Sequence, residues 1–322
     1  MMPTSNSQSD NGKFAVKYRL PTAIVLTTLL FLWASLRPLD VSHDTDLYVD
    51  MFNNYFSESG GRFSELLFGW IASALVVILE DIPNGREIGG RTFLVFIALI
   101  ESILFFLILK RKKVAEAVLM AFGFGPLIFL DVIRQGLAML LAGLFVLEDR
   151  SKKIYLIAAA MATHIVAAIA LLRLHLNKKH YKAVFVSAIV LLIVVYVLQD
   201  HLQGRYDYYV RVGYFQKFEE FEFSLNRISI LNIFVVIFFF FAGAIGGFSK
   251  PETAILVTLY LSSIIFPLMF RVYFFYFFVM ACSRDMLMPG KRITHVLFNI
   301  GYAFILLRFA MNAFQIFDKP AI

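Results

Sequence analysis

Charged residues are scarce in this sequence. Only 16% of its 322 residues are Asp, Glu, Lys or Arg, against 60% hydrophobic residues and a mean hydropathy of +0.75. A soluble domain carries nearer a quarter charged residues, and the apolar runs approach the ~20 residues that span a bilayer. The chain is therefore predicted to be an integral membrane protein. It has no room for a separate soluble catalytic domain, so its chemistry must lie in loops or inside the helix bundle.

Cysteine is almost absent too. Cys282 is the only one, so one chain can form neither a disulfide framework nor a thiolate metal site. The 9 prolines and 18 glycines exclude collagen-like and low-complexity chains. The first apolar run, 23–36, ends without a small-residue cleavage pattern, which predicts a retained span rather than a signal peptide.

The net charge of +7 and the pI near 9.4 come from short positive clusters at the ends of apolar runs. These clusters lie at 110–113, 150–153, 178–182 and 291–292. A nucleic-acid partner would favour basic residues along one polar face, so no nucleic-acid binding is expected. The positive-inside rule places the clusters, and the polar tail 1–17, on the cytoplasmic side.

The apolar stretches predict an all-α polytopic membrane protein of about nine to eleven transmembrane helices, with one membrane domain over 18–322. Simple alternation cannot keep every basic cluster inside. We therefore predict that 63–79 and 154–172 do not cross; two exceptions to the positive-inside rule are the alternative. The stretches lie at 18–37, 63–79, 91–109, 114–130, 132–147, 154–172, 183–200, 227–247, 252–270, 271–283 and 294–313.

The first predicted outer loop is acidic. Residues 38–65 hold six Asp and Glu against one arginine. Aromatic and apolar residues from Tyr48 to Phe56 recur at helical spacing, which predicts an amphipathic helix over 46–56 in the membrane interface. Asp44 and Asp46 are candidate catalytic carboxylates, and a helix N-cap is the alternative role for Asp44.

A helix break is predicted at Gly123-Phe124-Gly125-Pro126, shortly before Arg134-Gln135-Gly136 at the junction of two hydrophobic stretches. Glycines and a proline free backbone groups that need other partners, and such breaks tend to line cavities. Arg134 is therefore a candidate anion-binding residue. A local salt bridge to Asp131, three residues earlier, is the alternative.

Two polar residues stand alone in apolar runs. His164 lies near the middle of 154–172, where a histidine either faces a cavity or hydrogen-bonds a neighbouring helix. Arg271 lies at a junction in the most aromatic tract of the chain, two residues before Tyr273. We expect Arg271 to face a polar cavity or an anionic ligand.

The segment 205–211 combines Arg205 and Arg211 with three tyrosines, among them Tyr208. The arginine guanidinium can donate two parallel hydrogen bonds to phosphate oxygens, and aromatic faces pack against sugar rings. This outer loop therefore suits a phosphate joined to a sugar. Anchoring of tyrosine and arginine at the membrane interface is the alternative.

In order, these motifs resemble the EpsG family of polysaccharide-polymerising membrane proteins. The resemblance extends from about 40 to 275. Asp44-Thr45-Asp46 with Tyr48 is similar to the family's G-T-D-x-x-x-Y motif, and Arg134-Gln135-Gly136-Leu137-Ala138 is similar to its R-Q-x-x-A motif. Further along, 162–167 is similar to F-H-x-S-A and 271–274 to R-x-x-Y-F. The sequence departs from the family at His43 in place of glycine, Thr163 in place of an aromatic residue and Val166 in place of serine.

The resemblance implies a Wzy-like polymerase with a GT-C-type fold in a bacterial cytoplasmic membrane. Such proteins join oligosaccharide repeat units, carried on undecaprenyl diphosphate, at the outer face during O-antigen, capsule or exopolysaccharide synthesis. No cofactor and no metal ion are implied. The expected partners are the lipid-linked oligosaccharide and the bilayer, with a chain-length regulator as a further candidate.

Glycosyl transfer from such a lipid needs positive charge at the departing diphosphate and a base for the acceptor hydroxyl. We expect Asp44 or Asp46 to be this base, with His164 as the other candidate. The pair of aspartates as a Mg²⁺ site is the alternative to a metal-independent arginine pocket. The residues expected to bind substrate are Arg134, Arg205, Arg211, Arg271, Tyr48, Tyr208 and Tyr273.

Two other functions fit parts of the pattern. A flippase or transporter of lipid-linked oligosaccharide would use the same arginines on an anionic head group, and would be expected to show internal repeats, which the sequence lacks. An acyltransferase acting on surface glycans would centre on a histidine, with His164 as its candidate.

Overall fold

The computed structural model describes residues 7–37, 49, 52–53, 66–80, 82, 85–131, 133–147, 154–164, 167, 230–265, 268–290 and 292–313. All regular structure in these ranges is helical, which confirms the all-α prediction. The chain divides into two compact units, of which the first comprises residues 1–167 and 277–322 and the second residues 168–276.

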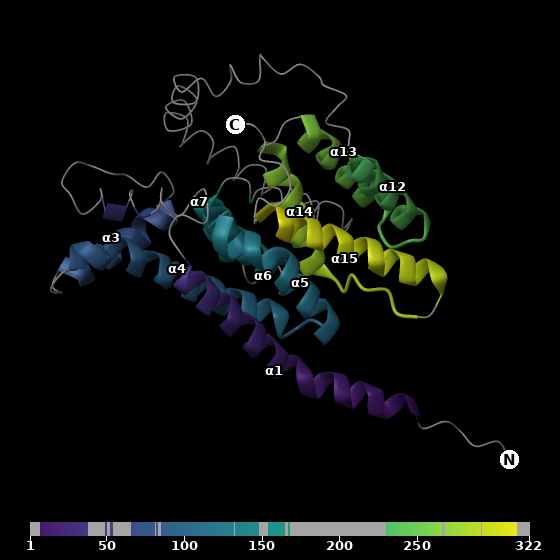
Figure 1. Cartoon of the computed structure of the whole chain (residues 1–322), viewed down its shortest axis with the longest axis horizontal. Coiled ribbons are helices and arrows are strands. Elements are labelled where there is room, and N and C mark those ends of the chain that lie inside the picture. Colours follow the sequence, from purple (N-terminus) through teal and green to yellow (C-terminus); the bar gives the residue numbers. More distant parts are fainter. Residues whose placement is uncertain are drawn as a thin grey trace. The chain divides into compact units, whose positions relative to one another are not determined.

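The first unit holds most of the described helices (Figure 1). They are α1 (Ser7–Leu36), α3 (Leu66–Glu80), α4 (Gly85–Leu109), α5 (Val114–Pro126), the π-helix η2 (Leu127–Asp131), α6 (Ile133–Leu147), α7 (Ile154–Thr163) and α15 (Ile293–Ala313). The second unit holds α12 (Ile230–Ala244) and α13 (Lys250–Ile265). Helix α14 (Leu268–Ser283) passes from the second unit into the first after Tyr276.

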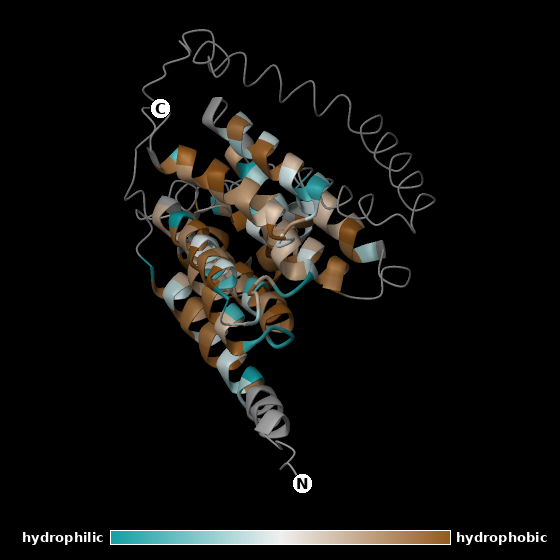
Figure 2. Cartoon of the chain, turned by 90° about the vertical axis from the view of Figure 1, so that its right-hand side faces the viewer, coloured by the Kyte–Doolittle hydropathy of each residue, from teal (hydrophilic) through white to brown (hydrophobic). Residues whose placement is uncertain are grey.

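The helices have the lengths and surfaces of a membrane protein. Tyr18–Leu36, Ile88–Leu109 and Ile293–Met311 are each long and apolar enough to cross a bilayer, and shorter apolar helices accompany them. Figure 2 shows hydrophobic residues along most helical surfaces and hydrophilic residues gathered near helix ends. Large side chains such as Trp70 remain exposed, which suits contact with lipid. The structure confirms a polytopic membrane fold.

The basic turn between α4 and α5 marks one end of the first unit. Lys112 Nζ donates to the carbonyl oxygens of Ala281 and Arg284, each at 2.6 Å, and Lys113 pairs with Asp285 at 3.0 Å. These bonds satisfy carbonyls left free where α14 ends. Because α4 and α14 end here and α5 begins here, we call residues 110–113 and 284–286 the basic end.

The opposite end of α4 meets the end of α1 and part of the first predicted outer loop. Arg91 Nη1 donates to the carbonyl oxygen of Arg37 at 2.7 Å. The rings of Phe52 and Phe93 stack with centroids 4.8 Å apart, and Phe52 is fully buried. The helical residues of the predicted 46–56 helix that the structure describes therefore pack on α4. We call this region, Arg37 with 49–53 and 90–93, the far end.

The non-crossing of 63–79 stays a prediction, which the position of α3 favours. This helix lies between the end of α1 and the start of α4, both of which are at the far end. Its 15 residues reach about 22 Å, less than the ~30 Å hydrocarbon core. A crossing by α3 would need a second crossing by 54–65, whose sequence is polar. The segment 154–172 is described only to His164 and at Ala167, so its non-crossing stays a prediction.

The predicted helix break at Gly123-Phe124-Gly125-Pro126 falls at its proline end, because α5 ends at Pro126 and the π-helix η2 follows. Helix α5 continues through all four residues and changes winding only at Leu127, where η2 begins. The glycines serve packing instead. A Cβ on Gly123 would lie 2.5 Å from Leu306 Cβ, and one on Gly125 would lie 2.8 Å from Leu30 Cδ2. Small residues thus let α5 approach both α15 and α1 closely.

The second unit is organised around an aromatic cluster. The Tyr260 hydroxyl donates to Asn232 Oδ1 at 2.7 Å, which joins α13 to α12. The Tyr260 ring meets the rings of Tyr273 and Phe239 edge to face, at 5.3 and 6.1 Å. Gly246, with φ of 78°, makes the turn between α12 and α13 that brings these aromatic faces together.

Candidate functional site

Arg37, directly after α1, is a buried cation at the far end. Arg37 is only 4% exposed, and its Nη1 donates a hydrogen bond to the carbonyl oxygen of Phe129 in η2. Its Nε makes no hydrogen bond to a described residue. Burial lowers the pKa of Arg37 to about 10; the Glu101 carboxylate opposes this shift, and Arg91 adds to it. An arginine guanidinium keeps its charge at neutral pH.

The π-helix η2 supplies the carbonyl that Arg37 binds. It follows Pro126, which has no backbone N–H to continue the α-helical ladder. A π turn shifts carbonyl oxygens out of the i to i−4 register, and such turns are frequent at functional sites. Because α6 begins at Ile133, the Arg37 bond to Phe129 fixes the backbone that leads directly into Arg134-Gln135-Gly136.

Glu101 packs against this same turn from α4. Its residue is 1% exposed, and Oε1 lies 3.1 Å from the position that a Cβ on Gly136 would take. The same Cβ would lie 2.6 Å from the carbonyl oxygen of Ile128, so only glycine fits between η2 and Glu101. Glu101 Oε1 makes no hydrogen bond to a described residue. A buried carboxylate inside a span is costly and usually functional.

The start of α6 is recessed relative to the far end. Gly136 faces Glu101 and Gly143 faces Ile108, so α4 and α6 run in parallel with a constant register. Arg91 lies ten residues before Glu101 on α4, which is about 15 Å along the helix. The Arg134-Gln135-Gly136 turn therefore lies well inside the bundle, while Arg37 and Arg91 lie nearer its end.

This arrangement places Arg37 and Arg91 near the end of the bundle, and Glu101 beside the 134–136 turn about 15 Å further in. Arg91 is partly exposed, so it can contact an anion directly, whereas buried Arg37 contributes positive charge at short range. We call Arg37, Arg91, Glu101 and the 134–136 turn the far-end polar cluster. At its outer end, the partly exposed Arg91 can bind an anionic group.

Sequence reasoning missed three members of this cluster, Arg37, Arg91 and Glu101. Glu101 carries a usable signal, because it is an acidic residue well inside the apolar stretch 91–109. Arg37 and Arg91 carry none, since each stands at the edge of a span, where arginine is ordinary. Their importance depends on the contact between α1 and α4, which the sequence does not reveal.

Among the predicted site residues, Arg134 lies in the first turn of α6, beside buried Gln135. His164 was expected in the middle of a continuous apolar segment. Instead α7 ends at Thr163, and His164 follows it, half-buried, with its N–H bonded to the carbonyl of Ala160 at 2.9 Å. Helix α7 packs along α6, so the two motifs come from neighbouring helices of the first unit.

Arg271 and Tyr273 belong to the second unit. Arg271 was expected at a junction between helices, but α14 already begins at Leu268, so Arg271 lies in its first turn and is exposed. Tyr273 is 1% exposed, and its ring packs against those of Tyr260 and Phe270. Substrate binding by these two residues stays a prediction.

The other predicted site residues lie outside the described residues. They are Asp44, Asp46, Tyr48, Arg205, Tyr208 and Arg211. Within the described ranges, no group of three or more His, Cys, Asp or Glu residues could hold a metal ion. The alternative of a Mg²⁺ site at Asp44 and Asp46 is therefore untested.

Comparison with known proteins gives one match. The model of the EpsG family matches residues 22–320, nearly the full chain. No curated protein and no solved structure matches. The matched range includes the far-end polar cluster and both arginine motifs, at Arg134 and at Arg271.

Proposed function

The chain belongs to the EpsG family, and we propose that it is a Wzy-type polysaccharide polymerase with a GT-C-type mechanism. It is a helical membrane protein of polysaccharide-polymerase type. Its proposed substrates are oligosaccharide repeat units carried on undecaprenyl diphosphate, joined at the outer face of the bacterial cytoplasmic membrane. The products would be O-antigen, capsule or exopolysaccharide chains.

The observation that carries this proposal is the far-end polar cluster. The family motif Arg134-Gln135-Gly136 forms the recessed start of α6, held by Glu101 on one side and by η2 on the other. Arg37 in turn fixes η2 through the Phe129 carbonyl. This motif lies inside the bundle, in a turn that its neighbours hold in place next to buried charges. Such a position suits contact with substrate rather than contact with lipid.

The proposed reaction breaks the bond between the sugar C1 and the diphosphate oxygen of the donor. An acceptor hydroxyl oxygen forms the new bond to C1, its proton passes to a carboxylate, and undecaprenyl diphosphate leaves. Arginines stabilise the charge on the leaving diphosphate, because their forked donors match its oxygens. We assign this role to Arg134 and Arg271, and assign Arg205 and Arg211 to the diphosphate or the entering glycan.

The base for the acceptor hydroxyl is proposed to be Asp44 or Asp46, with His164 as the other candidate. Glu101 is not assigned to this step, since its burial and its place behind Gly136 suit a positioning role. The aromatic residues Tyr48 and Tyr208 are proposed to pack against sugar rings.

The test is polymerisation by the purified protein in detergent, with undecaprenyl-diphosphate-linked repeat units as the substrate. We expect a ladder of longer lipid-linked glycans, since donor and acceptor need only one pocket. An Asp44→Asn, Asp46→Asn double variant should bind substrate without forming the ladder. A transporter would give no ladder in detergent, where no membrane separates two compartments, and that result would overturn the proposal.

A further inference from the structure

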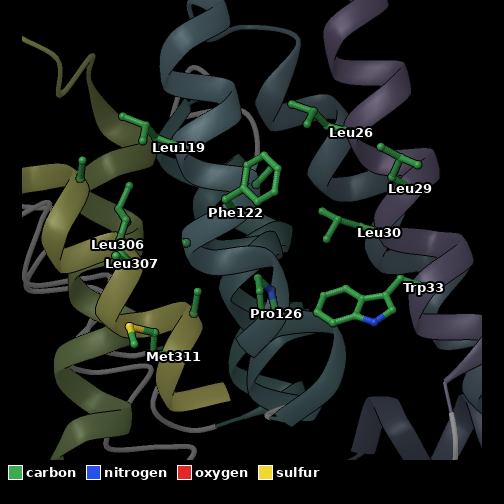
Figure 3. A pocket seen from close by; sticks show the side chains of 14 residues that line it. Leu26, Leu29, Leu30, Trp33, Leu119, Phe122, Pro126, Leu306, Leu307 and Met311 are labelled. Atoms are coloured by element: carbon green, nitrogen blue, oxygen red, sulfur yellow. The ribbon is translucent and has the colours of Figure 1, made fainter. Parts of the chain in front are cut away.

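An apolar groove of about 650 Å³ runs between α1, α5 and α15 of the first unit (Figure 3). Its walls include Leu29, Leu30 and Trp33 from α1, Phe122 and Pro126 from α5, and Met311 from α15. Among its lining residues the Trp33 indole is the one side chain with an N–H donor. Such a surface suits a hydrocarbon chain and no polar ligand.

The groove is open to the surroundings of the helices. Its floor forms where Gly123 and Gly125 draw α5 against α15 and α1. Its edges are exposed, with Phe122 68% and Leu29 59% accessible. Since exposed apolar faces of membrane helices contact lipid, a chain can enter this groove sideways from the bilayer.

At one end the groove leads to the far-end polar cluster. On α1 the groove-lining positions 26, 30 and 33 share one helix face, and Arg37 follows Trp33 by one turn on that face. On α5 the lining ends at Pro126, three residues before Phe129, whose carbonyl accepts the Arg37 bond. The groove therefore ends one helical turn before Arg37, whose carbonyl oxygen accepts a hydrogen bond from Arg91.

We propose that this groove binds the polyprenyl chain of the lipid-linked substrate, and that Arg91 and Arg37 are the first positive charges that the diphosphate meets on its way to Arg134. The proposal rests on the proposed function. The groove offers apolar walls to a hydrocarbon chain, and the positive charge of Arg37 and Arg91 lies beyond its outer end, where an anionic head group would lie.

The first test maps the chain directly and needs no polymerisation. Undecaprenyl diphosphate carrying a diazirine in its isoprenoid chain is photocrosslinked to the wild-type protein in detergent, and the labelled peptides are identified by mass spectrometry. We expect labelling of α1, α5 and α15 at groove positions, reduced by excess undecaprenyl diphosphate but not by excess phosphatidylglycerol. Labelling spread over other lipid-facing residues such as Trp70, or lost equally to phosphatidylglycerol, would overturn the proposal.

The second test fills the groove from α15. An Ala303→Phe, Ala310→Phe double variant places rings on two lining positions, whereas an Ala158→Phe, Ala254→Phe control adds the same two rings at exposed positions that do not line it. Because buried methylenes bind strongly, we expect the groove variant to raise KM for undecaprenyl-linked substrate about tenfold. Its KM for a short-chain prenyl-linked analogue should not change, nor should either KM of the control.

These outcomes separate the two proposals. Crosslinking in the groove without any polymer ladder would keep the groove assignment and refute the polymerase. If the groove-filling variant forms the ladder with an unchanged KM, the polymerase proposal stands and the groove assignment is refuted.

Discussion

Substitution of Gly136 by alanine tests whether the braced turn at the start of α6 has a catalytic role. The added Cβ would lie 2.6 Å from the carbonyl oxygen of Ile128, roughly 0.7 Å inside an ordinary carbon to oxygen approach. It would also lie 3.1 Å from Glu101 Oε1. A backbone carbonyl cannot rotate away as a side chain can, so η2 and the 134–136 turn must shift.

Overpacking of this kind costs about 1–3 kcal/mol of folding stability. Gly143→Ala is the matched control. It lies two turns further along α6, and its Cβ would approach side chains, with Cys282 Sγ at 2.8 Å and Phe278 Cε1 at 3.0 Å. Both variants should lose similar stability in thermal unfolding. A shift of several tenths of an ångström in catalytic groups can cost about 10- to 100-fold in rate.

We therefore expect Gly136→Ala, but not Gly143→Ala, to lose about 10- to 100-fold in polymerisation rate per folded protein. The assay measures glycan ladders from equal amounts of protein that elutes as a single folded species. Equal rates for the two variants, at equal stability, would refute the argument that the 134–136 turn is part of the site.

Three further predictions address other parts of the structure. Arg134→Lys and Arg271→Lys should each lose most polymerising activity despite keeping their charge, since an ammonium lacks the guanidinium fork; near wild-type ladders from both would leave them as anchors. A cysteine at exposed Asn53 should react with an impermeant thiol reagent from outside intact cells, while one at exposed Arg111 should not; the reverse pattern would invert the topology. Lys112→Met should lower the free energy of unfolding by about 3 kcal/mol, because it removes two buried 2.6 Å bonds to helix-end carbonyls; a loss below about 1 kcal/mol in denaturant titration would argue against that cap.

Hydrophobic runs predicted most of the described helices, because length and apolarity decide whether a segment can span a bilayer. Ile133–Leu147, for example, lies almost where the stretch 132–147 placed it. The same reasoning failed at Gly123 and Gly125. Glycine weakens an isolated helix, but here it permits close contact with Leu306 and Leu30, and the partner of a small residue cannot be read from its own sequence.

The candidate site was only partly predictable for a related reason. Arg134 stood out because it interrupts two hydrophobic stretches, whereas Arg37 looked like an ordinary residue at the end of a span. The role of Arg37 becomes visible only through its hydrogen bond to the Phe129 carbonyl in the π-helix η2, 92 positions away in sequence. His164 was placed in the middle of the apolar segment 154–172, of which the structure describes 154–164 and 167, with α7 ending at Thr163.

The most direct test of the account is to count products when two differently labelled lipid-linked repeat units are mixed with the purified protein. A polymerase must form a product that carries both labels on one undecaprenyl diphosphate, and must release one equivalent of free undecaprenyl diphosphate for each glycosidic bond formed. We predict this one-to-one ratio. Unchanged substrates, or release of undecaprenyl diphosphate without any doubly labelled product, would contradict the central claim.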